Sequence, residues 1–207
     1  EATWSFAAAC APFADRSGLC LVVDIGGGSV ELIAGSLGGA TSAPTAAIQQ
    51  RVSLDIGCVR LTERFLRGHP ASDDAVEAAT RHIDDALDDA LGNASLRVPP
   101  DALAIGTAGT ATALALVDAG PQSAWDPLDG GGFVLSAATV HGWAERLFGL
   151  SLSELHALHP DAMQGRADVF PVGVLLLSRV LRAFALDPCH VSPYELRHGL
   201  ALRSGSA

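Results

Sequence analysis

The feature that most constrains the fold is an apolar run over residues 19–24 that ends in an acid and is followed closely by three glycines. A continuous apolar run of this length is typical of a buried strand. Gly26, Gly27 and Gly28 then force a tight turn, because glycine reaches backbone angles that other residues avoid. Residues 29–34 return as a second strand, so the sequence predicts a hairpin.

The rest of the chain predicts alternating helices and strands. Helices are indicated by apolar residues at helical spacing and by serine caps, and strands by short apolar runs. The predicted order is strand 46–54, helices 57–66 and 72–93, strand 102–105, a helix within 106–117, helices capped by Ser136 and Ser151, an apolar helix 169–186 interrupted early by Pro171, strand 190–192 and helix 193–202. Three consecutive strands followed by alternating helices and strands is the RNase-H-like order of actin-like folds. We therefore expect an α/β domain with a mixed sheet flanked by helices.

The composition excludes some classes of function. The 207 residues are 49% hydrophobic and carry a formal net charge of −10. Such a chain can bury a sizeable core. Proteins that bind nucleic acid or membrane surfaces carry basic faces, so neither partner is expected. A polyanionic substrate would have to be held by a local site with metal ions, not by the overall field.

The cysteines and the apolar stretches bear on the compartment. The four cysteines lie far apart and form no CxxC pair, so a zinc site is not expected. We expect buried free thiols and a reducing, cytoplasmic compartment. No export signal is expected, and the apolar stretches are too short to span a bilayer.

The predicted hairpin carries the strongest chemical signal. Asp24 stands at the end of the first strand and Glu31 on the returning strand, with Ser29 between them. Backbone N–H groups of Gly26, Gly27 and Gly28 can form a nest for phosphate oxygens, to which Ser29 adds a hydroxyl. Two carboxylates across a tight turn suit Mg²⁺, which takes oxygen ligands and keeps several waters. The alternative is an ordinary glycine-rich hairpin with two exposed acids.

A second glycine-rich turn follows the strand predicted over residues 102–105. Gly106 and Thr107 lead into a helix, and the free N–H groups and dipole at a helix start favour an anion. Gly106 and Thr107 are therefore further candidates for phosphate binding. The alternative is a strand-to-helix turn of small residues with no ligand.

Five segments, taken together, resemble the Ppx/GppA family of exopolyphosphatases and guanosine-pentaphosphate phosphohydrolases. They are DIGGGSVE at 24–31, SLDIGCVRLTERF at 53–65, AIGTAGTATAL at 104–114, GRAD at 165–168 and SPYELRHGL at 192–200. Val30, Glu195 and His198 depart from the family pattern. Five segments in the family's order are far more specific than any one of them.

The resemblance implies two actin-like domains with the site between them. Residues 1–207 correspond to the second domain, with residues 1–17 as the helix that joins the two, and the first domain with its own phosphate loop is not expected in this chain. Glu1 matches the family's proposed catalytic base. Asp24 and Glu31 are implied to hold Mg²⁺ and to serve in catalysis.

The resemblance also implies a reaction. We expect Mg²⁺-dependent hydrolysis of the terminal phosphoanhydride bonds of inorganic polyphosphate, with guanosine pentaphosphate as the alternative substrate. An ATP-dependent kinase or ATPase of the same superfold and a non-catalytic phosphate-binding module stay open as other classes. The expected protein partners are the first domain and a second copy in a homodimer. Half of a two-sided site should be inactive alone.

Other polar residues give weaker signals. A run of acids in the predicted helix 72–93 indicates a solvated face more than a metal site. The members of this run are Asp84, Asp85, Asp88 and Asp89. Three histidines, at 141, 156 and 159, show no metal-ligand spacing, so surface or cap roles are expected. Arg51, Arg60 and Arg64 either line a substrate channel or pair with the many acids.

Overall fold

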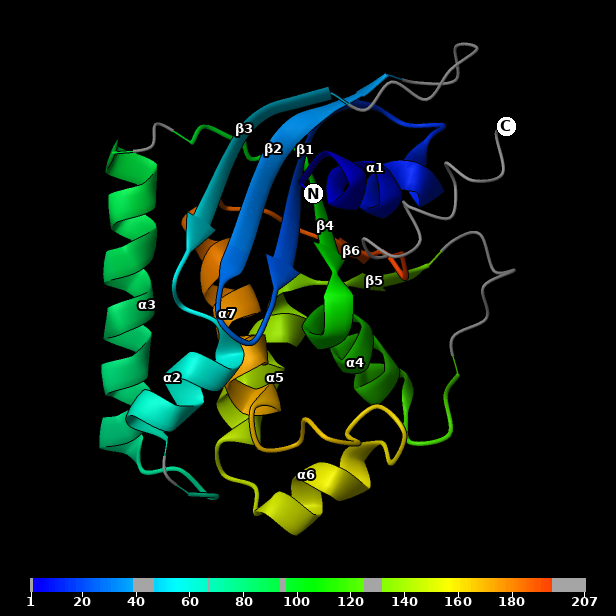
Figure 1. Cartoon of the computed structure of the whole chain (residues 1–207). Coiled ribbons are helices and arrows are strands. Elements are labelled where there is room, and N and C mark those ends of the chain that lie inside the picture. The colour runs from blue at the N-terminus through cyan, green and yellow to red at the C-terminus, as the bar shows by residue number, and fades with distance from the viewer. Residues whose placement is uncertain (1, 39–46, 67, 94–95, 125–131, 195–207) are drawn as a thin grey trace.

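A mixed sheet with helices on both faces forms the body of the molecule (Figure 1). The computed structural model describes residues 2–38, 47–66, 68–93, 96–124 and 132–194. Over this part of the chain the sheet has six strands in the order β3-β2-β1-β4-β6-β5. Strands distant in sequence are neighbours in this sheet. The carboxyl ends of β1 and β4 lie beside the amino end of β2, at the same end of the sheet.

The strand order confirms the RNase-H-like arrangement predicted from the sequence. β1 (Ser17–Ile25), β2 (Val30–Gly38) and β3 (Ala47–Leu54) form an antiparallel meander. β4 (Leu103–Thr107) then pairs parallel to β1. Parallel pairing requires a crossover connection, and the helices between β3 and β4 supply it.

The helices divide between the two faces of the sheet. On one face lies α1 (Ala2–Cys10), followed by a 3₁₀ turn over Ala11–Phe13. The other helices are α2 (Cys58–Phe65), α3 (Asp73–Asn93), α4 (Ala108–Ala119), α5 (Ala137–Leu147), α6 (Leu152–Leu158) and α7 (Phe170–Ala183). All six contribute to the hydrophobic core on the opposite face.

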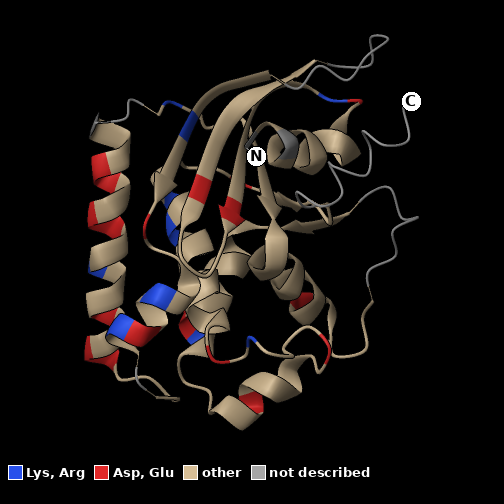
Figure 2. Ribbon diagram, in the orientation of Figure 1, with Lys and Arg blue, Asp and Glu red and all other residues tan. Residues whose placement is uncertain are grey.

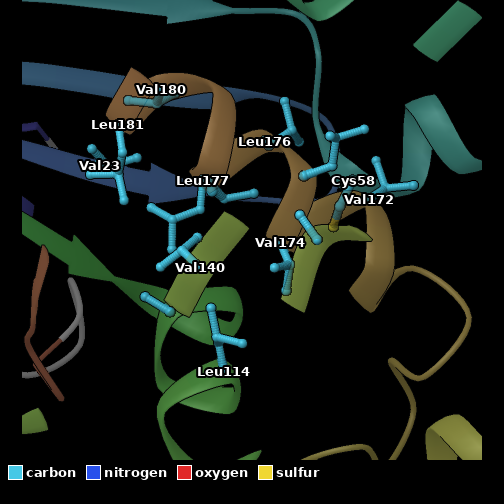
Figure 3. Close-up of a cluster of buried hydrophobic side chains, with 14 of the residues drawn as sticks. Val23, Cys58, Leu114, Val140, Val172, Val174, Leu176, Leu177, Val180 and Leu181 are labelled. Atoms are coloured by element: carbon cyan, nitrogen blue, oxygen red, sulfur yellow. The ribbon is translucent and has the colours of Figure 1, made fainter. Parts of the chain in front are cut away.

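The larger core is built around α7. Side chains of α7 such as Val174 and Leu177 meet Val23 of β1, Leu114 of α4 and Val140 of α5 (Figure 3). A smaller cluster joins α1 to the other face of the sheet through Phe6, Phe13, Val22, Ile33 and Ile105. Alternate residues of each central strand therefore face different cores, as the two-residue period of a strand requires.

The serine caps confirm two of the predicted helix starts. Ser136 accepts a hydrogen bond from the Thr139 amide at the start of α5. Ser151 and Glu154 form a capping box at the start of α6. These patterns were predictable because a capping hydrogen bond involves only residues three apart in sequence.

Other predictions differ from the structure at particular elements. Pro171 does not interrupt α7: it lies in the first turn, where a missing N–H costs nothing because that group has no helical partner. β5 (Phe133–Leu135) was not predicted. Its antiparallel partner β6 (Cys189–Val191) begins one residue before the strand predicted over 190–192. The last predicted helix, 193–202, lies mostly outside the described residues.

The cysteines and the helices agree with two further expectations. All four cysteines are buried free thiols, as predicted. Among the described residues no helix is both long and apolar enough to cross a membrane.

Candidate functional site

Four polar residues from four adjacent strands form one row across the sheet. Strand register places Ser53 of β3 opposite Glu31 of β2, Glu31 opposite Asp24 of β1, and Asp24 beside Thr107 of β4. Residues directly opposite in neighbouring strands share a face of the sheet. Figure 2 shows the acidic positions of β1 and β2 side by side near the end of the hairpin. The structure thus brings together the two carboxylates that the sequence singled out.

The row lies on the α1 face of the sheet. Val22 precedes Asp24 by two residues and packs in the small cluster under α1, so Asp24 shares that face. Ile33 gives the same result for Glu31. Glu1, the candidate base, lies outside the described residues, while α1 begins at the next position, Ala2.

Two hydroxyls orient the Glu31 carboxylate. Ser29 Oγ donates to Glu31 Oε1 at 2.6 Å, and Ser53 Oγ donates to the same oxygen at 3.2 Å. No protein donor to Oε2 is present in the described part of the chain. The side chain is therefore fixed through one oxygen, which leaves the other for a ligand. Ser29 was predicted to bind phosphate, and the structure adds this bond to Glu31.

The glycine turn is held from behind by α2. The amides of Gly57, Cys58 and Val59 donate to the carbonyls of Gly28, Gly26 and Gly27 at 2.9–3.1 Å. These carbonyls point toward the start of α2, so the turn itself caps that helix. The amides of residues 27–29 donate to no protein acceptor within the described residues. The Gly26 amide, one of the three donors predicted from the sequence, instead donates to the Ser29 carbonyl at 2.9 Å, whereas the amides of residues 27–29 can donate to an anion.

Close backbone contact explains one further glycine. A Cβ at Gly57 would lie 2.3 Å from the Gly27 carbonyl oxygen, a distance that real Cβ atoms do not reach. The start of α2 can therefore approach the turn only without a side chain at this position.

Burial meanwhile raises the pKa of the Cys58 thiol, which favours its neutral form beneath the turn.

Gly106 and Thr107, at the second glycine-rich turn, are both buried. A Cβ at Gly106 would meet Ala111 at 2.9 Å and Cys189 at 3.1 Å, so this glycine permits close packing. The Thr107 hydroxyl donates to the Tyr194 carbonyl at 2.8 Å. The strand register places Thr107 beside Asp24, while Gly106 lies one residue further into the sheet.

The start of α4 is strained and has an arginine beside it. Ala108 has φ 61°, a left-handed conformation that is uncommon for a residue with a side chain and often marks a functional site. Arg166 Nη1 donates to the Gly109 carbonyl at 2.8 Å. No role was predicted for Arg166, although it lies in the GRAD segment. Arg166 lies 57 residues from Gly109 in sequence, and only the fold reveals their contact.

The donor set at the hairpin fits Mg²⁺. Two carboxylates on one face, one with a free oxygen, supply the oxygen ligands that Mg²⁺ takes, and this ion is often bound by only one or two carboxylates with waters. No group of three or more His, Cys, Asp or Glu side chains able to hold a metal occurs among the described residues.

The other polar candidates serve structural roles. Asp84 accepts two hydrogen bonds from Arg179, and the acids at 85, 88 and 89 are exposed on α3. His141 is exposed and pairs with Glu145. His159 accepts from the Ala162 amide, which is a cap role. The acids at 85, 88 and 89 form the solvated face that was predicted, whereas Asp84 is half-buried in an ion pair; the two histidines have the expected surface and cap roles.

The fold and the site define an actin-like domain with a glycine-rich, acidic turn at the edge of its sheet. A solved Ppx/GppA phosphatase family member of Aquifex aeolicus is similar, with a TM-score of 0.79 and 25% identity, over 98% of this chain and 62% of that one. A solved exopolyphosphatase-like protein also gives a TM-score of 0.79, at 30% identity, over 98% of this chain and 63% of the other.

The family model of the Ppx/GppA phosphatase family matches residues 1–206, and the chain belongs to that family. It is 34% identical to Exopolyphosphatase 2 of Mycobacterium tuberculosis and 30% identical to Exopolyphosphatase 1 of Mycobacterium leprae. Each alignment covers 98% of this chain but only 60% and 56% of the relative. The chain thus spans a little over half the length of the curated relatives it matches.

Proposed function

We propose that this chain supplies one side of the active site of an enzyme that hydrolyses the terminal phosphoanhydride bonds of inorganic polyphosphate. The observation that carries the proposal is the pairing of Asp24 with Glu31 across an anion-binding glycine turn. The names of the mycobacterial relatives support polyphosphate as the substrate. Free buried thiols fit a reducing compartment, and we place the enzyme in the cytoplasm.

The turn would hold the phosphoryl group that is transferred. In this proposal the free amides of residues 27–29 donate to its oxygens, and Ser29 adds to the polar lining. At the second turn we assign the contacts to the amides that open α4, with Thr107 shaping the junction and Gly106 allowing close packing. Arg166 adds a positive charge beside them. Phosphoryl transfer depends mainly on such positioning and charge stabilisation.

The carboxylates have a different role from the amides. Asp24 and Glu31 would hold Mg²⁺, which neutralises charge on the phosphate oxygens when it is bound. Ser29 and Ser53 keep Glu31 in one orientation. Water attacks the terminal phosphorus, the bond to the bridging oxygen breaks, and the shortened polyphosphate leaves. Glu1 would take the proton from that water, as the family resemblance implies.

The site as proposed needs a second side. The described residues supply a hairpin and the start of α4, but no second phosphate loop facing them. We propose that a first domain of the same protein carries that loop and that residues 1–17 join the two domains. We also propose a homodimer for the intact protein.

The test is phosphate release from polyphosphate with Mg²⁺ by the full-length protein. Asp24→Asn and Glu31→Gln should each lower turnover by at least about two orders of magnitude, the scale of losing a positioned catalytic group. Asp88→Asn, on the exposed side of α3, is the matched control and should leave turnover unchanged. Thermal midpoints should stay close to that of the wild type.

Near-normal turnover of a folded Asp24→Asn protein would refute the metal role. Guanosine pentaphosphate assayed in parallel decides the substrate. Release from that nucleotide and none from polyphosphate would replace the proposed substrate by the alternative. Tight binding of both without release would support a non-catalytic module.

A further inference from the structure

A hollow extends from the carboxylate pair along β3. It has a volume of about 680 Å³ and is lined by Ser5, Asp24, Gly26, Ser29, Glu31, Ile33, Arg51, Val52 and Ser53. One end is the glycine turn with its two acids. The wall that leads away from the turn carries Ser53 and then Arg51. The hollow is therefore longer than the place for a single phosphoryl group.

Arg51 shares the face of the row of polar residues at the site. Register pairs Ser53 with Glu31 and Arg51 with Ile33, so Arg51 follows Ser53 at the next position on that face. Two residues along a strand span about 7 Å. The long arginine side chain adds reach in the same hollow. The guanidinium can thus meet a group bonded to the phosphate at the turn, but at some distance from it.

The three candidate arginines differ in their partners. Arg60 Nε donates to the Gly28 carbonyl at 3.1 Å, and its Nη2 lies 3.8 Å from Asp55. Arg64 lies against the Phe65 ring and within 3.3 Å of His82. Among the described residues Arg51 has no ion-pair or hydrogen-bond partner. It is also the one cation that lines the described part of this hollow.

Arg51 has no protein partner in the described structure and lines the same hollow as the glycine turn and its two acids, so it can bind an anionic group there. Arginine binds phosphate oxygens with two parallel hydrogen bonds, which makes it well suited to a phosphate chain.

We propose that Arg51 binds substrate phosphates beyond the one being hydrolysed and thereby favours long polyphosphate over short. The proposal rests on the proposed function of the same site. The turn and the two carboxylates bind the terminal phosphate, while Arg51 binds phosphates further along the polyphosphate chain. A short substrate gains little from that second contact.

The test compares Arg51→Gln with Arg64→Gln in the full-length protein. Arg64 is the matched control because it is an exposed arginine committed to α2 and α3, outside the hollow. Phosphate release is measured from long-chain polyphosphate and from tripolyphosphate. Arg51→Gln should raise KM for the long chain about tenfold with kcat nearly unchanged, since it removes binding shared by ground and transition states. Tripolyphosphate should change less than about twofold.

Further readouts separate this role from a structural one. Arg51→Lys should restore part of the lost affinity for the long chain, because a lysine keeps the charge but not the paired hydrogen bonds. The salt dependence of kcat/KM for the long chain should also become shallower in Arg51→Gln. Equal losses for both substrates, or a loss of kcat alone, would overturn the proposal.

Binding measured separately distinguishes the two proposals. Wild-type protein that releases no phosphate from any polyphosphate overturns the proposed function. Long-chain polyphosphate is then titrated into wild type and Arg51→Gln by calorimetry. Equal affinities overturn the role of Arg51, and a weaker variant supports it as a phosphate-chain contact whatever the reaction.

Discussion

At the scale of single residues, the glycine turn is positioned by contacts that are distant in sequence. The turn ends at Ser29, and the amides that hold it begin at Gly57. Because backbone meets backbone at Gly57, a side chain added there must displace either the turn or α2. A catalytic group displaced by a fraction of an ångström loses much of its effect.

Gly57→Ala tests this positioning. A Cβ would lie 2.3 Å from the Gly27 carbonyl oxygen, so the turn or α2 must move. We expect a loss of about 1–3 kcal/mol in the free energy of unfolding, as for other overpacked sites, together with lower turnover. Urea unfolding and phosphate release measure the two effects.

Gly142→Ala is the control for the same substitution. Gly142 lies within α5, and a Cβ there meets nothing within 4 Å. Alanine should therefore leave activity unchanged and stabilise the helix by about 0.4–1 kcal/mol. If Gly57→Ala behaves like Gly142→Ala in both assays, the close contact between α2 and the turn is not needed for stability or for turnover.

The residues of the turn were predictable, but several of their neighbours were not. Asp24, Gly26 and Glu31 lie within eight positions, and local spacing was enough to single them out. Ser53, in contrast, reaches Glu31 through strand pairing. A local sequence pattern cannot predict this contact, because strand pairing brings together residues that are distant in sequence.

At the scale of elements, an ion pair joins the two long helices behind the sheet. Arg179 of α7 donates to both carboxylate oxygens of Asp84 on α3, at 2.6 and 2.7 Å. The Arg179 side chain is only 17% exposed. A bidentate, partly buried pair is stronger than the exposed pairs of the surface.

A double-mutant cycle measures this pair. Asp84→Asn and Arg179→Met should each destabilise the protein, because each leaves a partly buried partner without its counter-charge. The coupling free energy should be about 1–3 kcal/mol. Asp88→Asn, also on α3 but exposed, should change stability by less than about 0.5 kcal/mol. Coupling near zero would show that α3 is held by its apolar face alone.

Elements with strong local signals were predictable, and short ones were not. α6 begins where its capping box lies, and α7 carries a long apolar sequence. β5 has three residues and no turn chemistry of its own, so its identity depends on β6 beside it. Pairing of this kind is decided by tertiary contacts that a local pattern does not contain.

At the scale of the whole molecule, one buried histidine links stability to pH. His190 of β6 lies at the edge of the Phe13 ring, with Arg16 Nη1 3.3 Å from its Nε2. Burial, and then the Arg16 charge, lower the pKa of His190. The folded protein therefore disfavours the protonated ring, whereas the unfolded chain protonates it below about pH 6.5.

The sign of the pH effect follows from this shift. Above about pH 6.5 the ring is neutral in both states, and its contribution to stability is fully present. As pH falls below that value the unfolded state binds more protons, so the free energy of unfolding decreases. Thermal midpoints measured from pH 7 to pH 5 should fall more steeply for wild type than for His190→Gln. Parallel curves would show that other groups cause the acid effect.

The architecture was predicted from the strand order, and the family resemblance implied that this chain carries one side of a two-sided site. Family membership follows from segments spread over nearly the whole chain. The described residues provide a glycine turn, two carboxylates and the start of α4 on one side. We propose that this is one side of a phosphate-binding site whose other side lies on a second domain.

The most direct test of that claim is phosphate release from long-chain polyphosphate in Mg²⁺, measured for the 207-residue chain beside the full-length protein. Circular dichroism first establishes that the chain is folded. We predict that turnover by the chain is less than about 1% of the full-length value, because one side of the site cannot hold the reacting groups in place. Turnover comparable to the full-length protein would contradict it and place the whole site within these residues.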